Sequence, residues 1–252
     1  MTAFGILDTS TAMPEPKLDI AGISIVFVGN FNPTILQPYW LADQELIRKE
    51  EAKTATIEII HPEGTAITIG NLKVSATSDR FSVQTEDASA YETARDLAMG
   101  VMKLLPHTPV RAMGINSDVH YIMPTEESWH ALGDEVAPKE FWSNILHKTG
   151  LRSLTMEGQR QDGFKGFIRV RIEPSLRVKT GVFIQVNDHY VPNIEDAAKT
   201  DAGIAQTPEE QPGSTSEDFV DILRSNWSNF LELKKRVNTS IMRIKDESGT
   251  SS

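Results

Sequence analysis

The hydrophobic and polar positions predict a chain rich in β-strands. Residues 23–31 form a mostly apolar run with many β-branched side chains, which is typical of a strand buried on both faces. Residues 54–61, 65–76 and 80–85 alternate apolar and polar positions, and turn-forming residues separate the three stretches. These three stretches together predict an antiparallel meander. Residues 110–123 predict another strand further along the chain.

A hairpin is predicted at residues 164–173 and 176–186, around Pro174. Alternation places three apolar side chains of each strand on one face, which we expect to contact the core: Ile168, Val170, Ile172, Val182, Ile184 and Val186. The hairpin is therefore expected to have one apolar face and one polar face.

Three segments before the C-terminal region have helical features. Pro33 fits the first position of a helix, and Pro38 is expected to kink or end that helix. Residues 88–105 have an apolar stripe at helical spacing and predict a well-defined helix. Residues 126–148 predict one helix broken near Pro138 or two short helices.

The longest predicted element is an amphipathic helix at residues 216–245, about 45 Å long at 1.5 Å per residue. One interpretation is that its distal part binds a protein partner or a second copy, with Asn226 fixing the register as in coiled coils. The residues of this expected interface are Asn226, Leu233, Val237, Ile241 and Ile244. The alternative is that the stripe lies along the protein's own sheet and that Asn226 faces solvent.

These elements predict an α+β fold with a mainly antiparallel sheet, helices packed on one face and a long C-terminal helix. The expected organisation is a disordered N-terminus at 1–18, a core domain at 19–191 and an acidic flexible loop at 192–215. The helix at 216–245 follows, and 246–252 form a disordered tail. The core also suggests two loosely similar strand–helix–meander halves.

Composition narrows the function classes. The 252 residues include no cysteine, which excludes disulfides, thiolate nucleophiles and cysteine-ligated metals. The net charge of −10 argues against a protein that coats nucleic acid or an anionic membrane over its whole surface. The first twenty residues lack the features of a signal peptide, so a cytoplasmic location is expected. No metal or cofactor is predicted.

Familiar catalytic motifs are missing from the sequence. HExxH, GxSxG, SxxK, GxGxxG and the phosphate-binding GxxxxGK[ST] are all absent. Asp118 and His120 alternate on one predicted strand face, and with Asp188 and His189 they could form an acid–base or metal site. The alternative is that they are polar residues facing solvent.

The predicted hairpin is locally basic. Between positions 150 and 180 there are seven basic and three acidic residues, a local charge of +4. A basic stripe that includes Phe167 could bind an anion or nucleic acid, and its expected residues are Lys165, Arg169, Arg171, Arg177 and Lys179. The alternative is that these charges pair with the protein's own carboxylates or are screened by the acidic loop.

Four stretches, VGNFNPTILQPYWL, HTPVRAMGINSDVHY, LTMEGQRQDGFKGFIRVRIEPS and GVFIQVNDHY, resemble uncharacterised bacterial proteins of similar size and α+β character. The chain is also distantly similar to a sporadically distributed prokaryotic family in which a Gly-Leu-Arg-Tyr-like strand precedes later strands and a long C-terminal helix. Gly114-Ile115-Asn116 stands at that position here. The resemblance implies the fold and no activity.

Three hypotheses on function follow. The first is a non-enzymatic binding or assembly module, because catalytic motifs are missing and the C-terminal helix is long and amphipathic. The second is an anion or nucleic-acid binder that uses the basic hairpin. The third is an enzyme of an unfamiliar class that uses Asp118, His120 and His189.

Overall fold

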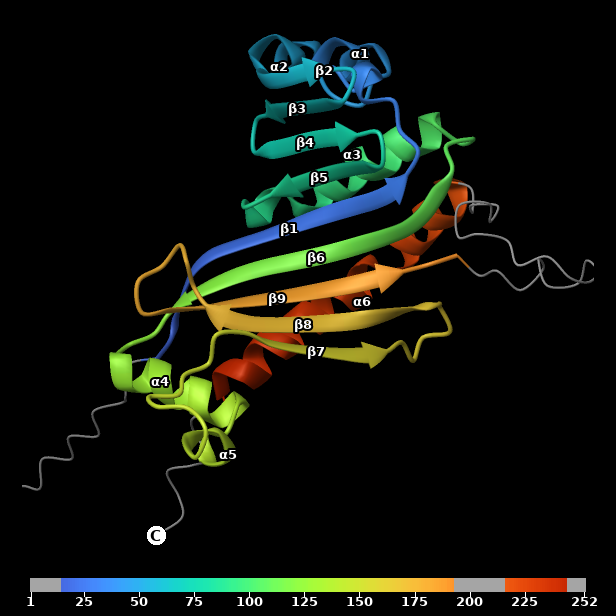
Figure 1. The fold of residues 1–252 in the computed structure, drawn as a ribbon. Coiled ribbons are helices and arrows are strands. Elements are labelled where there is room, and N and C mark those ends of the chain that lie inside the picture. Colours follow the sequence, from blue (N-terminus) through green and yellow to red (C-terminus); the bar gives the residue numbers. More distant parts are fainter. Residues whose placement is uncertain (1–14, 193–215, 244–252) are drawn as a thin grey trace, which may run out of the picture.

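The computed structural model describes residues 15–192 and 216–243, which form a nine-stranded antiparallel sheet accompanied by helices (Figure 1). The strand order is β2-β3-β4-β5-β1-β6-β9-β8-β7. The predicted α+β class, the mainly antiparallel sheet and the long C-terminal helix are confirmed. None of the described helices combines the length and the apolar character that a membrane crossing requires.

The elements have the following bounds. The strands are β1 (Lys17–Gly29), β2 (Thr56–His61), β3 (Gly64–Ile69), β4 (Leu72–Thr77), β5 (Arg80–Thr85), β6 (Val110–Ile122), β7 (Leu154–Gln159), β8 (Gly166–Pro174) and β9 (Gly181–Tyr190). The helices are η1 (Pro33–Ile35), α1 (Pro38–Asp43), α2 (Lys49–Thr54), η2 (Ala88–Ala90), α3 (Tyr91–Leu104), α4 (Glu126–Val136), α5 (Glu140–Ser143) and α6 (Ser216–Arg243).

The chain consists of two halves of similar topology, as the sequence suggested. Each half begins with a 13-residue strand, β1 or β6, which short helices follow. A meander then returns, and its last strand, β5 or β9, pairs with that first strand. Each half ends with a helix, α3 or α6. The two halves join where β1 and β6 pair antiparallel in the middle of the sheet.

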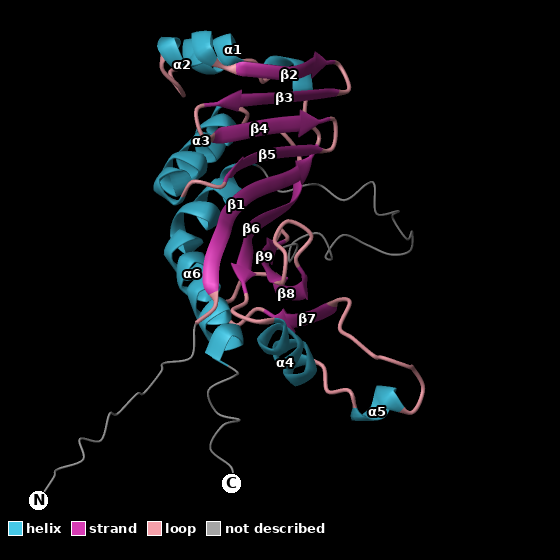
Figure 2. Cartoon of the chain, turned by 90° about the vertical axis from the view of Figure 1, so that its left-hand side faces the viewer, coloured by secondary structure: helices cyan, strands magenta, loops and turns pink. Residues whose placement is uncertain are grey.

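The two faces of the sheet differ because only one is covered by long helices. Figure 2 shows α3 and α6 along one face, whereas the short helices lie at the two ends of the sheet. On the covered face, Ile25 and Phe27 of β1 and Ile115 of β6 are fully buried. The intervening side chains, among them Ser24 and Asn116, point to the uncovered face because successive strand residues alternate.

The C-terminal helix packs on the protein's own core. It buries Phe219, Leu223, Trp227 and Phe230, and Figures 1 and 2 both place α6 along the sheet. At its start, the Ser216 hydroxyl lies 3.0 Å from each of the Met102 and Leu105 carbonyl oxygens, at the end of α3. These contacts join the last helix of one half to the last helix of the other.

The structure therefore corrects the partner interpretation of α6. Leu233 and Val237 are partly buried and Ile241 is buried, so most of the expected interface already packs within the chain. Asn226 is also buried, with an Nδ2 contact to the Ile222 carbonyl at 3.4 Å, and it does not face solvent. Ile244 lies outside the described residues.

Several predicted boundaries also differ. The stretch 65–76 is two strands, since Gly70 adopts φ 55° in a turn, a conformation that glycine reaches without a steric penalty. Strand β1 begins at Lys17, inside the segment 1–18 that was expected to be disordered, because Lys17 pairs with Ile122. The expected acidic loop lies almost entirely outside the described residues, as does the tail at 246–252.

Replacing Phe230 with alanine tests whether α6 belongs to the core. Phe230 is fully buried, so Phe230→Ala is expected to lower the free energy of unfolding by about 3–5 kcal/mol through lost burial and a residual cavity. Urea unfolding measures this loss, with Glu232→Ala on the exposed face of α6 as a control that should change little. An unchanged stability in Phe230→Ala would show that α6 is dispensable for the core.

Candidate functional site: a polar groove on the uncovered sheet face

A continuous row of polar side chains crosses the uncovered face of the sheet. The strand registers align one residue from each of the nine strands, and all of these side chains are polar. In sheet order the row is Thr56, Thr68, Lys73, Gln84, Ser24, Asn116, Asn187, Arg169 and Glu157. Such a row offers hydrogen-bonding groups across the whole width of the sheet.

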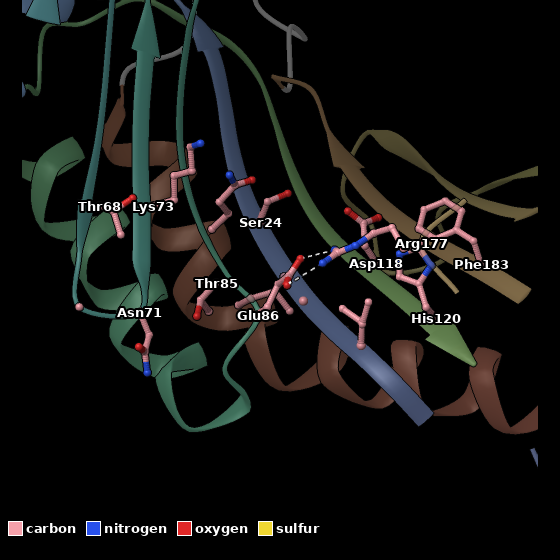
Figure 3. Close-up of a pocket in the computed structure, with 15 residues that line it drawn as sticks. Ser24, Thr68, Asn71, Lys73, Thr85, Glu86, Asp118, His120, Arg177 and Phe183 are labelled. Atoms are coloured by element: carbon pink, nitrogen blue, oxygen red, sulfur yellow. Dashed lines mark hydrogen bonds and ion pairs between the residues drawn. The ribbon is translucent and has the colours of Figure 1, made fainter. Parts of the chain in front are cut away.

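A groove of about 510 Å³ lies over part of this row. Most of its lining comes from β1, β4, β5 and β6, together with the β8–β9 loop, and Figure 3 shows the labelled side chains around it. Its principal polar and aromatic residues are Ser24, Thr68, Asn71, Lys73, Gln84, Glu86, Asp118, His120, Arg177 and Phe183. The volume falls in the range of about 300–1,000 Å³ that is usual for small-molecule sites.

An ion pair bridges the groove. Arg177, in the β8–β9 loop, contacts Glu86 just after β5, and the dashed lines in Figure 3 mark this pair. The Arg177 guanidinium lowers the pKa of the Glu86 carboxyl. Both side chains are about half exposed, so the pair contributes at most about 1 kcal/mol to stability. Its main consequence is positional, because it links the loop to the other half of the sheet.

Gly22 of β1 leaves room for this bridge. A Cβ atom at position 22 would lie 3.3 Å from Cγ of Glu86 and 3.1 Å from the carbonyl oxygen of Thr85. Both distances are shorter than ordinary van der Waals contacts. A larger residue at position 22 would therefore force Glu86 or the Thr85 carbonyl to shift by a few tenths of an ångström.

Ser175 holds the β8–β9 loop in place. Its Oγ accepts hydrogen bonds from the backbone N–H groups of Arg177 (3.1 Å) and Val178 (2.9 Å), and it lies 2.8 Å from Nδ1 of His120. Since both acceptor positions of the hydroxyl are used, its proton is donated to Nδ1, and His120 carries its own proton on Nε2. The serine is thus a turn-stabilising group, and this geometry does not favour a nucleophilic role.

His120 is held in its neutral form. Burial lowers the pKa of the imidazole, and the nearby positive charge of Arg177 lowers it further. The ring also contacts that of Phe183, with centroids 4.9 Å apart. At neutral pH, His120 therefore offers the groove an Nε2–H donor without a charge.

The remaining polar groups form short chains of hydrogen bonds. Gln185 Nε2 donates to Asp118 Oδ1 at 2.7 Å. Asn187 donates to Asn116 Oδ1, and Asn116 Nδ2 in turn donates to the Ser24 hydroxyl at 3.2 Å. These contacts fix the orientations of the amides, so the face presents a defined pattern of donors and acceptors.

The structure does not assemble the predicted acid–base site. Asp118 and His120 both line the groove, but His189 pairs with Gly114, six positions from His120 along β6. At about 3.4 Å per residue, that separates the two histidines by roughly 20 Å. The prediction of a single site that contains Asp118, His120 and His189 is therefore wrong. His189 instead stacks on Phe167, with centroids 4.4 Å apart.

Asp188 lies on the opposite face of the sheet. Its side chain is buried, accepts a hydrogen bond from the Tyr190 hydroxyl at 2.8 Å and pairs with Arg160. Burial raises the pKa of the Asp188 carboxyl, against the opposing effects of Tyr190 and Arg160. The Arg160 guanidinium also lies over the Tyr190 ring at 3.8 Å. This cluster fastens the chain after β7 to β9, away from the groove.

The basic hairpin is largely neutralised by carboxylates. Arg169 pairs with Glu157 at 2.6 Å and Arg171 with Glu173 at 3.6 Å, and Arg177 pairs with Glu86 as described above. Lys179 lies in the β8–β9 loop. Each described arginine of the expected anion site therefore has an acidic neighbour, as the alternative interpretation anticipated.

Lys165 departs from the predicted stripe. It precedes β8, so the alternation of that strand does not extend to it, and it lines a separate cavity beside the start of α6. The stripe on the uncovered face consists of Phe167, Arg169 and Arg171. The guanidinium of Arg169 lies over the Phe167 ring at 4.6 Å, and that of Arg171 lies over the Phe183 ring at 5.3 Å.

Sequence reasoning missed most of the groove. Ser24 and Gln84 were parts of predicted strands, but their alignment depends on pairing between distant segments. Glu86 and Arg177 are 91 positions apart, and no sequence spacing indicates their contact. The available signal was the polar alternation within each strand, which marks a solvent-facing side without identifying a site.

No protein-family model matches this chain, and no curated protein matches it. Within residues 15–192 and 216–243, no cluster of three or more His, Asp or Glu side chains is arranged to hold a metal ion.

The turn-stabilising role of Ser175 can be tested by replacement with alanine. Ser175→Ala leaves two loop N–H groups and His120 Nδ1 without their partner, so the free energy of unfolding should fall by about 1–3 kcal/mol. Ser153→Ala is a matched control, because the Ser153 hydroxyl makes one exposed contact, to Glu173. Equal, small losses in the two variants on urea unfolding would contradict the role assigned to Ser175.

The lowered pKa of His120 predicts a pH dependence of stability. As the pH falls below the ordinary histidine value of about 6.5, the unfolded chain takes up the proton before the folded protein does. The stabilisation is therefore present above that pH and is lost progressively below it. The lowered pKa of His189, also caused mainly by burial, has the same sign.

Thermal unfolding at several pH values between neutral and mildly acidic measures this effect. His120→Gln should show a smaller decrease in melting temperature on acidification than the unaltered protein. His61→Gln, at a largely exposed position near the β2–β3 turn, is the control and should retain the full decrease. A full decrease in His120→Gln as well would assign the effect to other groups.

Proposed function

We propose that this protein is a non-enzymatic binding module whose ligand surface is the groove on the uncovered sheet face. The observation that supports the proposal most directly is the row of polar side chains aligned across all nine strands. A sheet face that only needs to remain soluble has no requirement for oriented hydrogen-bond chains or for a groove. Small-molecule sites usually combine a concave surface with a few fixed polar groups.

The charges of the groove favour a neutral ligand. Lys73 and Arg177 balance Glu86 and Asp118, and His120 is neutral at pH 7, so the lining has no net charge. Lys73 is also paired with Glu58 at 2.9 Å. An ionic ligand would have to compete with these internal pairs, whereas the hydroxyls and amides remain suited to hydrogen bonds with a neutral molecule.

The ligand class follows from this lining. Ser24, Thr68, Asn71 and Gln84 offer hydroxyl and amide groups, and Phe183 adds an aromatic ring at one end. Such a surface suits a neutral molecule with several hydroxyl or amide groups, such as a saccharide, a nucleoside or a short peptide. A binding role also agrees with the positions of Ser175 and His120, which stabilise the loop beside the groove.

A second candidate function is binding of single-stranded nucleic acid over β8 and β9. The observation that favours it is that Phe167, Arg169 and Arg171 share one face of β8, because aromatic rings and arginines are the groups that contact bases and phosphates. Bases would have to displace Arg169 and His189, which already lie over the Phe167 ring. The acidic partners Glu157 and Glu173 oppose it, since phosphates would have to displace them. We therefore favour the groove.

Titration with a panel of small molecules tests the primary proposal. Neutral saccharides, nucleosides and dipeptides are added to the labelled protein, and backbone amide shifts are followed by NMR. Shifts should concentrate in β1, β4, β5 and β6. Gln84→Ala should raise the dissociation constant of the ligand that binds most tightly by about fivefold to tenfold, because one hydrogen bond is lost. Gln159 lies on the same face but outside the groove, so Gln159→Ala is the control and should leave the dissociation constant unchanged.

Salt and an oligonucleotide separate the two candidates. Affinity for a neutral ligand should change little when the salt concentration is raised. Binding of an oligothymidine that falls steeply with salt, and that is weakened in Arg169→Ala and Arg171→Ala but not in Gln84→Ala, would favour the second candidate. Amide shifts confined to another surface would contradict both.

A further inference from the structure

The two edges of the sheet differ in their protection against pairing with another strand. At the β2 edge, the register shifts between Ile57 and Ile59, and Figure 1 shows α1 and α2 beside this strand. A bulge and nearby helices are common means of blocking an edge. At the other edge, β7 pairs with β8 in uninterrupted register from Leu154 to Gln159.

Strand β7 has fewer protective features: α4 lies near its start (Figures 1 and 2), where Leu154 packs against the same apolar cluster as Leu132, and the register of β7 has no bulge. It contains no proline or lysine, and its one charged residue, Glu157, is paired with Arg169 of the neighbouring strand. Among the described elements, none pairs with its outer side. Its backbone N–H and C=O groups on that side therefore form a template for one more strand.

Exposed apolar side chains occur on this edge strand and on the segment that precedes it. Met156 of β7 is 63% exposed. The segment at 139–150, which we call the arm, leads directly toward β7, and Figure 2 shows its helix α5 projecting from the body of the protein. Four large apolar side chains of the arm are 46–67% exposed: Phe141, Trp142, Ile145 and Leu146. Their spacing places them on one side of a helical turn.

We propose that β7 and the arm form the interface of a homodimer, in which the β7 strands of two copies pair antiparallel and join the two sheets. The sequence of β7 favours self-pairing centred on Met156. In that register Met156 lies opposite Met156 of the other copy, and Thr155 lies opposite Glu157 of the other copy. Centring on Glu157 would place two carboxylates opposite each other, which is destabilising.

The arm completes the interface. Pairing of a six-residue strand extends over only about 20 Å, less contact than a stable dimer requires, since specific interfaces bury at least about 1,200 Å². The arm precedes the start of β7, and antiparallel pairing brings the end of the other copy's β7 to that position. The exposed arm side chains then have an apolar surface to cover, including Met156 of both copies.

Sedimentation equilibrium of the purified full chain tests this proposal. We expect twice the mass of one chain, and Met156→Lys should raise the dimer dissociation constant by at least about tenfold, because lysine on an edge strand opposes pairing. Trp142→Ser should also weaken the dimer. Both positions are exposed, so the melting temperature of the monomer should be retained in each variant.

Ile59→Lys at the β2 edge is the matched control, since Ile59 is also exposed and should leave the dimer intact. A monomer at all accessible concentrations would overturn the proposal. So would a dimer that persists in Met156→Lys and Trp142→Ser but dissociates in Ile59→Lys, because the interface would then lie at β2. Each result is independent of ligand binding in the groove.

Discussion

The antiparallel pairing of β1 with β6 is the interaction on which the rest of the structure depends. The two strands pair over nearly their full lengths, from Lys17 opposite Ile122 to Gly29 opposite Val110. Each then receives on its other side the last meander strand of its own half. Pairing residues that are about 90 positions apart closes a long loop, which costs chain entropy. Burial of neighbouring apolar side chains such as Ile25 and Ile115 offsets this cost.

Coverage of one face determines the character of the other. Helices α3 and α6 cover the apolar side of the central strands, so the alternate residues of these strands face away from them (Figure 2). Apolar residues there would leave a wide exposed patch. The chain instead places polar groups on that face and links Ser24, Asn116 and Asn187 by hydrogen bonds. One-sided coverage thus explains why this face is polar, whereas the groove also depends on the β8–β9 loop and on the ion pair of Arg177 with Glu86.

Much of the fold could be predicted from local patterns. Periodicity identified α3, the break near Pro138 and the apolar sides of β8 and β9, because these depend on neighbouring residues. The turn at Gly70 was missed although the apolar alternation changes phase there, because Ile69 and Leu72 are three positions apart. Periodicity could not decide what the stripe of α6 packs against. Its apolar stripe is the same whether it packs on its own sheet or on another chain.

The candidate site was less predictable because it is formed by register. Asp118 and His120 were recognised as residues of one strand face, and both line the groove. Their neighbours Glu86 and Arg177 come from distant parts of the chain. His189 was grouped with them by residue type, yet the β6–β9 register separates it from His120. A shift of the strand register by one residue moves a side chain to the other face of the sheet. A shift by several residues changes which groups on that face lie close enough to interact.

The proposed dimer and the proposed binding site are compatible in geometry. The groove is lined mainly by β4, β5, β1 and β6, whereas β9 and β8 separate β6 from the β7 edge. Antiparallel pairing of β7 about an axis perpendicular to the sheet leaves both grooves on the same face. Nine strand spacings separate the two β1 strands, which is roughly 40 Å at about 4.8 Å per spacing. A dimer would therefore present two neutral grooves side by side, an arrangement that gains avidity for a ligand with repeated binding groups.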